Sequence, residues 1–126
     1  MSTTYTPARA AALSGFTLDT LRYYEREGIM PAVARTAGGH RLYSEADIST
    51  LGFLRCLRDT GMPIELLKRY GQLCRDDDTL AERLDLLREH AAGVQQQIDE
   101  LLEQQRRLDE KIGWYRGELD RRAGTA

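Results

Sequence analysis

The sequence has few cysteines and no long apolar run, and each shortage excludes a class of protein. It holds two cysteines in 126 residues, Cys56 and Cys74, at a spacing that matches neither a CxxC pair nor a Cys/His zinc motif. We therefore expect two free thiols, no metal and no other cofactor. No stretch of eighteen apolar residues is present, and residues 1–4 lack the basic and apolar parts of a secretion signal. A cytoplasmic protein without membrane contact is expected.

Signatures of catalysis are also missing. The sequence shows no Ser/His/Asp or Cys/His/Asn arrangement and no glycine-rich loop for phosphate binding. Its two histidines, His40 and His90, fall in a predicted hairpin and a predicted coiled coil. We expect a protein that is not an enzyme.

Composition favours one compact domain followed by an extended element. Apolar residues make up 41% and charged residues 30% of the chain, which is too apolar for a disordered protein. Residues 1–75 hold ten Lys/Arg and seven Asp/Glu, a charge of +3, while residues 76–126 hold eight and thirteen, a charge of -5. A basic front and an acidic rear suit a chain that lays only its front on a polyanion.

Two short helices are predicted near the N-terminus. Thr6 and Pro7 form a helix start, and Gly15 can take the left-handed conformation that ends it. Thr17 caps a second helix that runs to about Glu27. Two helices joined by so short a turn form a helix-turn-helix, whose second helix enters a major groove in proteins that bind DNA.

A two-stranded wing is predicted after the helix pair. Residues 33–43 alternate in polarity around Gly38-Gly39, a dipeptide that supplies the positive φ angles of a tight hairpin. Arg35, His40 and Arg41 would line this ribbon.

Two further helices are predicted as scaffold beneath the wing. Ser44 to Asp47 approximates a capping box and opens a third helix through about Asp59. Pro63 starts a fourth helix that runs to about Cys74.

A heptad pattern fills the second half of the chain. Its apolar seam follows spacings of four and three through Leu80, Leu84, Leu87, Ala91, Val94, Ile98, Leu101, Gln105, Leu108, Ile112, Tyr115 and Leu119. Some forty residues make a rod of roughly 60 Å. One helix cannot bury its own stripe, so we expect a second copy of the chain as partner. The predicted dimerisation residues are Leu84, Leu87, Val94, Ile98, Leu101, Leu108, Ile112 and Tyr115.

The expected fold is mainly α. A winged helix-turn-helix head of about four helices and a two-stranded wing occupies residues 1–75, a long coiled-coil dimerisation helix occupies residues 76–122, and residues 123–126 form a short tail.

Two motifs carry a resemblance to a known family. TLRYYEREG at residues 20–28 and GGHRLYSEAD at residues 38–47, followed by a long helix, resemble the signatures of the MerR family of transcriptional regulators. The resemblance implies a homodimer with antiparallel long helices, whose two heads bind promoter DNA and distort it for RNA polymerase. It also implies that the DNA contacts include Thr17, Arg22, Tyr23, Arg41, Tyr43 and Arg58. To these we add Arg35 and His40 of the predicted hairpin. For Tyr43, packing in the wing is an equal alternative.

Cys56 lies in a segment with a narrower resemblance. FLRCLRDTGM at residues 53–62 looks like the thiol-bearing segment of the NmlR/AdhR branch, which responds to aldehydes, electrophiles and nitrosative stress. This implies that Cys56 is a sensor whose alkylation or oxidation shifts the head. Two alternatives stay open: an inert core thiol, since the dipole at a helix C-terminus disfavours a thiolate, and an effector sensed without covalent chemistry. No cysteine follows Cys74, which disfavours metal sensing of the family's usual kind.

One rival of another class remains at this point. A coiled-coil interaction protein could use its helix-turn-helix to bind protein instead of DNA, because that geometry also occurs outside DNA-binding domains.

Overall fold

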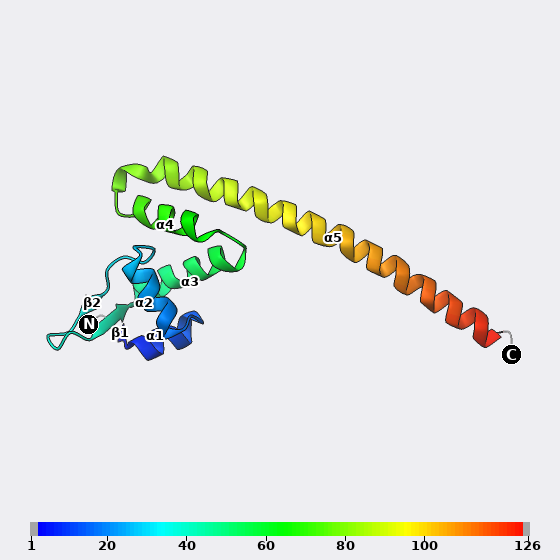
Figure 1. Cartoon of the computed structure of the whole chain (residues 1–126), viewed down its shortest axis with the longest axis horizontal. Coiled ribbons are helices and arrows are strands. Elements are labelled where there is room, and N and C mark those ends of the chain that lie inside the picture. The colour runs from blue at the N-terminus through cyan, green and yellow to red at the C-terminus, as the bar shows by residue number, and fades with distance from the viewer. Residues whose placement is uncertain (1–2, 125–126) are drawn as a thin grey trace. The chain divides into compact units, whose positions relative to one another are not determined.

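The computed structural model describes residues 3–124. In chain order the elements are β1 (Thr4–Tyr5), α1 (Pro7–Ser14), α2 (Leu18–Arg26), β2 (Ala34–Arg35), β3 (Arg41–Ser44), α3 (Glu45–Asp59), α4 (Ile64–Leu73), a short 3-10 turn (Asp77–Thr79) and α5 (Leu80–Gly124) (Figure 1). The mainly helical winged helix-turn-helix fold predicted from the sequence is confirmed. The chain forms two compact units, a head that extends to Arg88 and a rod that begins at Glu89.

The helix-turn-helix forms where the capping residues predict it. The Thr6 side chain accepts a hydrogen bond from the Arg9 backbone, and Gly15 ends α1 with φ of 78°. The Thr17 hydroxyl then accepts a hydrogen bond from the backbone N–H of Thr20 at 3.1 Å, which satisfies one of the free donors at the start of α2.

The wing has one strand more than the sequence predicts. The strand order is β1-β3-β2, with Arg35 opposite Arg41 on one side of β3 and Tyr5 opposite Tyr43 on the other. The predicted two-stranded hairpin, β2 with β3, is confirmed, and β1 adds a third strand on the other side of β3. A strand of two residues is too short to show an alternating pattern, so β1 left no signal in the sequence.

The remaining head helices start and pack as short scaffold elements. The Ser44 side chain accepts from the Asp47 backbone at 3.1 Å and the Asp47 carboxylate accepts from the Ser44 backbone at 2.9 Å, so the predicted capping box is confirmed. Helix α4 crosses the loop after α2 so closely that a Cβ on Gly71 would lie 2.4 Å from the Gly28 carbonyl oxygen.

The core of the head lies between α1, α2, α3, α4 and β3. Its largest fully buried side chains are Leu21, Ile29, Met30, Tyr43, Leu51, Leu54 and Leu67. Leu86 and Leu87 of α5 pack against this cluster, so the compact unit of the head includes the start of α5 as far as Arg88. Leu87, expected in the dimerisation seam, is thus partly covered by its own head.

The rod is the larger part of a single helix, α5, and has no core of its own. Helix α5 has 45 residues, a length of about 68 Å, and none of them is buried. The predicted seam is open to solvent from its middle to its end, at Ile98, Leu101, Leu108, Ile112, Tyr115 and Leu119. The helix includes residues 123–124 of the predicted tail, and residues 125–126 lie outside the described part of the chain. Between residues 3 and 124 we find no helix with the length and apolar character needed to span a membrane.

Candidate DNA-binding surface

Helix α2 presents a polar, basic face outward. Leu21 and Tyr24 anchor its inner side in the core. On the outer side, Arg22 lies 3.6 Å from the Asp19 carboxylate, and the Arg26 guanidinium lies over the Tyr23 ring, 5.5 Å from its centre. Each guanidinium remains largely exposed, so it is free to reach a ligand.

Glu25 fastens the wing to this helix. Its carboxylate forms an ion pair with Arg41 of β3, and its other oxygen lies 3.8 Å from Arg35 of β2. The Glu25 side chain is only 13% exposed, so the bridge is shielded. No local pattern in the sequence distinguishes Glu25, which is one of three acids in residues 19–27 and lies beside Arg26.

The wing tip is held by its own polar contacts. Arg35 donates a hydrogen bond to the Gly39 carbonyl at 3.0 Å, and the Thr36 N–H donates to the His40 carbonyl at 2.8 Å. Gly39 takes φ of 83°, as the hairpin prediction requires. Arg35 and His40 are exposed and Arg41 is half-buried, so three predicted contacts lie together on the ribbon.

Tyr43 lies in the core of the head. It is 1% exposed, and burial followed by the nearby Glu25 charge raises the pKa of its hydroxyl. Tyr24 is buried in the same way and packs edge-on against Phe16, with ring centres 5.1 Å apart. Of the two alternatives for Tyr43, the position favours packing.

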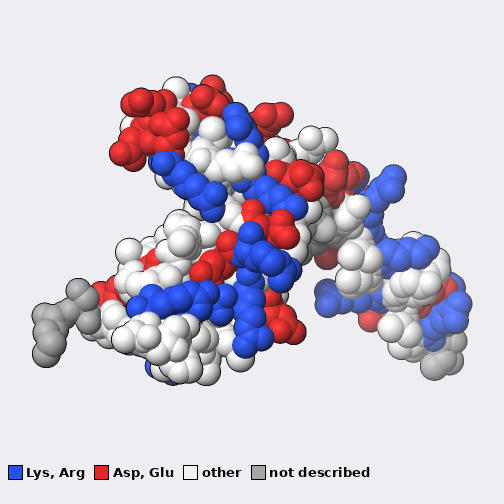
Figure 2. Space-filling view, turned by 60° about the vertical axis from the view of Figure 1, so that its left-hand side comes forward, with Lys and Arg blue, Asp and Glu red and all other residues white. Residues whose placement is uncertain are grey.

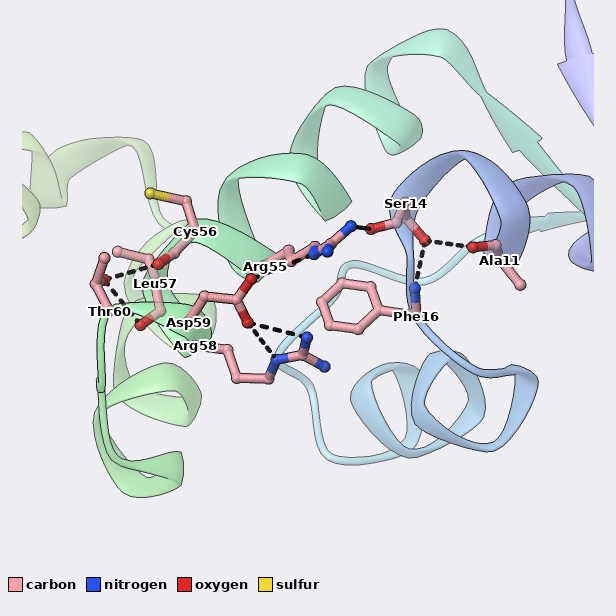
Figure 3. A network of polar contacts seen from close by, with 9 residues as sticks. All are labelled: Ala11, Ser14, Phe16, Arg55, Cys56, Leu57, Arg58, Asp59 and Thr60. Carbon is pink, nitrogen blue, oxygen red and sulfur yellow. Dashed lines mark hydrogen bonds and ion pairs between the residues drawn. The ribbon is translucent and has the colours of Figure 1, made fainter.

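The end of α3 is tied to the turn of the helix-turn-helix (Figure 3). Two nitrogens of Arg58 lie 3.1 and 3.0 Å from Asp59, and the same guanidinium lies 4.7 Å from the centre of the Phe16 ring. Arg55 lies 3.3 Å from the other Asp59 oxygen and donates to the Ser14 carbonyl at 3.1 Å. These hydrogen bonds, Arg58's first, lower the pKa of the Asp59 carboxyl.

Cys56 lies on the outside of α3. It is exposed, so the alternative of a core thiol is wrong for this chain. Its carbonyl accepts a hydrogen bond from the Thr60 hydroxyl at 2.7 Å, while its sulfur points away from Arg55 and Arg58 (Figure 3). Cys74 is half-buried at the end of α4, and the prediction of two free thiols is confirmed. No cluster of three or more metal-ligating side chains exists within residues 3–124.

The predicted contacts other than Tyr43 come from elements of the head that touch one another. Thr17, Arg22 and Tyr23 come from α2, and the Glu25 bridge brings Arg35 and Arg41 of the wing against the same helix. Arg58 lies against Phe16, the residue before Thr17. Figure 2 shows Lys and Arg side chains collected in bands over one face of the head. Such a surface suits a polyanion.

Comparisons with known proteins identify the family of this chain. A family model described as "MerR HTH family regulatory protein" matches residues 5–73. An uncharacterised HTH-type transcriptional regulator of Haemophilus influenzae is 38% identical over 113 residues, which cover 89% of this chain and 84% of that protein. The regulator AdhR of Bacillus subtilis is 43% identical over 75 residues, 60% of this chain and 54% of AdhR.

A solved structure gives the same result for the fold. The chain is similar to HiNmlR, described as "a MerR family regulator lacking the sensor domain, bound to promoter DNA", with a TM-score of 0.83 and 37% identity over 90% of this chain and 91% of that one. The chain belongs to the MerR family, and the resemblance to its NmlR/AdhR branch is confirmed.

The protein is therefore a DNA-binding transcriptional regulator of the MerR type. The expectation that it is a regulator and not an enzyme is confirmed by these relatives, and the rival class of a coiled-coil protein without DNA is wrong.

Proposed function

We propose that the chain regulates transcription as a homodimer that distorts promoter DNA. Helix α2 enters the major groove, the wing contacts the adjacent backbone, and RNA polymerase is engaged at the same promoter. The observation that carries this proposal is the Glu25 bridge, which fixes the wing arginines against the recognition helix. The promoter DNA named for HiNmlR supports it.

The proposed contacts divide by chemistry. Arg22 and Tyr23 project from α2 toward base edges or phosphates, and Arg22 can donate two hydrogen bonds to a guanine. The remaining contacts are to the backbone and fix the position of the head: Thr17, Arg35, His40, Arg41 and Arg58. Since phosphate contacts release counterions, affinity should fall steeply with salt.

Fluorescence anisotropy with labelled DNA tests this assignment. A duplex from the chain's own promoter region is compared with a shuffled duplex of the same composition. Arg22→Ala should weaken specific binding by roughly 10- to 100-fold, equivalent to about 1–3 kcal/mol. Arg107→Ala, an exposed arginine of the rod, is the matched control and should bind as the parent does. Equal affinity for the two duplexes would refute the proposed function.

The pairing direction follows from the charges beside the seam. Antiparallel pairing can place Leu80 opposite the partner's Leu119, Leu84 opposite the partner's Tyr115, and Ile98 opposite the partner's Leu101, so that every seam position has a partner. In this register Arg88 faces the partner's Asp109, which is an attractive pair. Antiparallel pairing is therefore favoured electrostatically.

Parallel pairing would place like charges together. Residues five apart then face each other across the seam, so Arg83 meets the partner's Arg88 and Lys111 meets the partner's Arg116. Each repulsive contact occurs twice in a symmetric dimer. No opposite charges are brought together in exchange, which disfavours this direction.

We also infer that Cys56 is the site at which the regulator is switched. The thiol is exposed, and Arg55 and Arg58 on either side of it hold the turn between α1 and α2. Alkylation or oxidation of Cys56 would disturb the end of α3. Through Arg55 and Arg58 it would shift the turn between α1 and α2, and with it helix α2. A Cys56→Ser variant in an aldehyde-dependent transcription assay tests the idea, with Cys74→Ser as the matched control. A response retained by Cys56→Ser would remove Cys56 from the mechanism and leave an effector sensed non-covalently.

A further inference from the structure

A hollow opens on the head, and none of its lining residues is an arginine. Its volume is about 270 Å³, and its main walls are Ile29, Pro31, Phe53, Leu54, Tyr70 and Cys74. The Phe53 and Tyr70 rings lie 6.0 Å apart, and Phe53 is 41% exposed. Two aromatic rings, aliphatic side chains and a thiol make a site for a flat, apolar group.

This hollow lies beside the flank of α5 that faces the head. Tyr70 and Cys74 both line the hollow, and Tyr70 packs against the same core cluster as Leu86 and Leu87 of α5. Burial raises the pKa of Tyr70 and the charge of Arg83 on α5 lowers it. Leu86, on the same flank of α5 as Arg83, packs against the core. A partner helix that pairs with the seam near Leu84 therefore lies next to the hollow on one side.

The antiparallel register identifies what lies there. It brings Glu118 of the partner opposite Arg83, which is a second attractive pair. Trp114 precedes Glu118 by one helical turn and shares its flank. It is the only tryptophan of the chain and is 55% exposed in the single copy, with Lys111 stacked on its ring.

We propose that Trp114 of one protomer seats in the hollow formed by Phe53, Tyr70 and Cys74 of the other. The proposal rests on the antiparallel homodimer described above. Buried tryptophans commonly anchor interfaces, and this one joins the end of each rod to the opposite head.

Thiol reactivity tests the seat directly. In a Cys56→Ser background, Cys74 is the remaining thiol, and its alkylation by a maleimide reports how well the hollow is covered. Trp114→Ala should speed this reaction by about tenfold or more, because it uncovers the thiol. Arg116→Ala, at the same height on the other flank of the rod, is the matched control and should leave the rate unchanged. Equal rates in all three proteins would overturn the proposal.

Intrinsic fluorescence gives a second, independent readout. Trp114 emission should shift to longer wavelength, and acrylamide quenching should increase, when Phe53→Ala opens the hollow of the opposite head. Sedimentation at the same concentration separates the possible failures. A monomer defeats the proposed function as well, whereas a dimer with an unchanged Trp114 spectrum defeats only the seat and leaves the hollow for a small apolar ligand.

Discussion

The head and the rod of this protein satisfy their apolar side chains in opposite ways. The head buries its large hydrophobic residues among four short helices and a small sheet, and no described buried side-chain polar atom lacks a hydrogen-bond partner. The rod has leucines, isoleucines and aromatic rings along one helix, and none of its described residues is buried. The head can thus complete its core within one copy of the chain, whereas the rod can bury its stripe only against a partner, which we propose is a second copy.

The largest expected effect comes from placing a charge in the middle of the seam. In the proposed register, Leu101→Lys puts two lysines per dimer into the central layers. Loss of two buried leucine side chains at about 1.5–3 kcal/mol each weakens dimerisation by at least about 100-fold. Sedimentation equilibrium measures this change. Gln96 lies on the side of α5 away from the seam, so Gln96→Lys should leave the dimer intact. A dimer that survives Leu101→Lys would contradict the proposal that the rod buries its apolar stripe against a second copy.

A smaller effect is expected from a cavity in the head. Leu54 is 1% exposed, so Leu54→Ala should lower the free energy of unfolding of the head by about 2–5 kcal/mol. Urea denaturation followed by circular dichroism gives the value. Leu13→Ala, an exposed leucine of α1, is the matched control. A loss for Leu54→Ala no larger than that for Leu13→Ala would show that the head does not hold a core of its own.

Glycines respond differently in the two regions. A methyl group on Gly71 would meet the Gly28 and Ile29 carbonyl oxygens at 2.4 and 2.8 Å, so Gly71→Ala should destabilise the head by about 1–3 kcal/mol. Gly113 in the rod has no atom within 4 Å of that position, and Gly113→Ala should stabilise the helix by up to about 1 kcal/mol. Thermal melts of the two variants show whether each substitution lowers or raises the melting temperature. Two shifts of the same sign would contradict the difference between a packed head and an open rod.

Local signals in the sequence predicted most of the fold. Thr6, Gly15, Thr17 and the Ser44 capping box act on their own neighbours, so the sequence sufficed to place the helices. The sequence did not reveal β1, because two residues pair only through contact with a distant strand. The sequence also did not reveal that Leu86 of α5 packs on the core of the head, because this contact depends on the tertiary fold.

The candidate DNA-binding surface shows the same difference between local and tertiary signals. The exposed arginines of α2 and the wing stand out in the sequence as basic residues in a motif. The ion pair that holds the wing against α2 does not stand out in the sequence, because Glu25 binds Arg41 sixteen residues away. The sequence also left the exposure of Cys56 and the burial of Tyr43 open, because each depends on which face of its element meets the rest of the head.

The smallest expected effect is the pH dependence of stability that Asp59 contributes. Asp59 binds Arg55 and Arg58, which contact the turn between α1 and α2. The hydrogen bonds from Arg58 and Arg55 hold the Asp59 pKa below its usual value, so the ionised carboxylate stabilises the folded head. This stabilisation is present above the usual Asp pKa of about 3.9 and is lost as pH falls through the lower folded value. Because the carboxylate is half-exposed, solvent screens the effect.

Asp59→Asn should therefore unfold more easily than the parent at neutral pH, with a difference that shrinks to nothing in acid. Urea denaturation from pH 7 down to about pH 3 measures the two curves. In an Arg58→Gln background the same substitution should cost less, because the main donor to the carboxylate is already gone. If the difference in unfolding free energy stays constant with pH, or is unchanged in the Arg58→Gln background, the Asp59–Arg58 ion pair does not stabilise the packing of α3 on the turn between α1 and α2. The proposed coupling from Cys56 to α2 would then lack the contact that connects them.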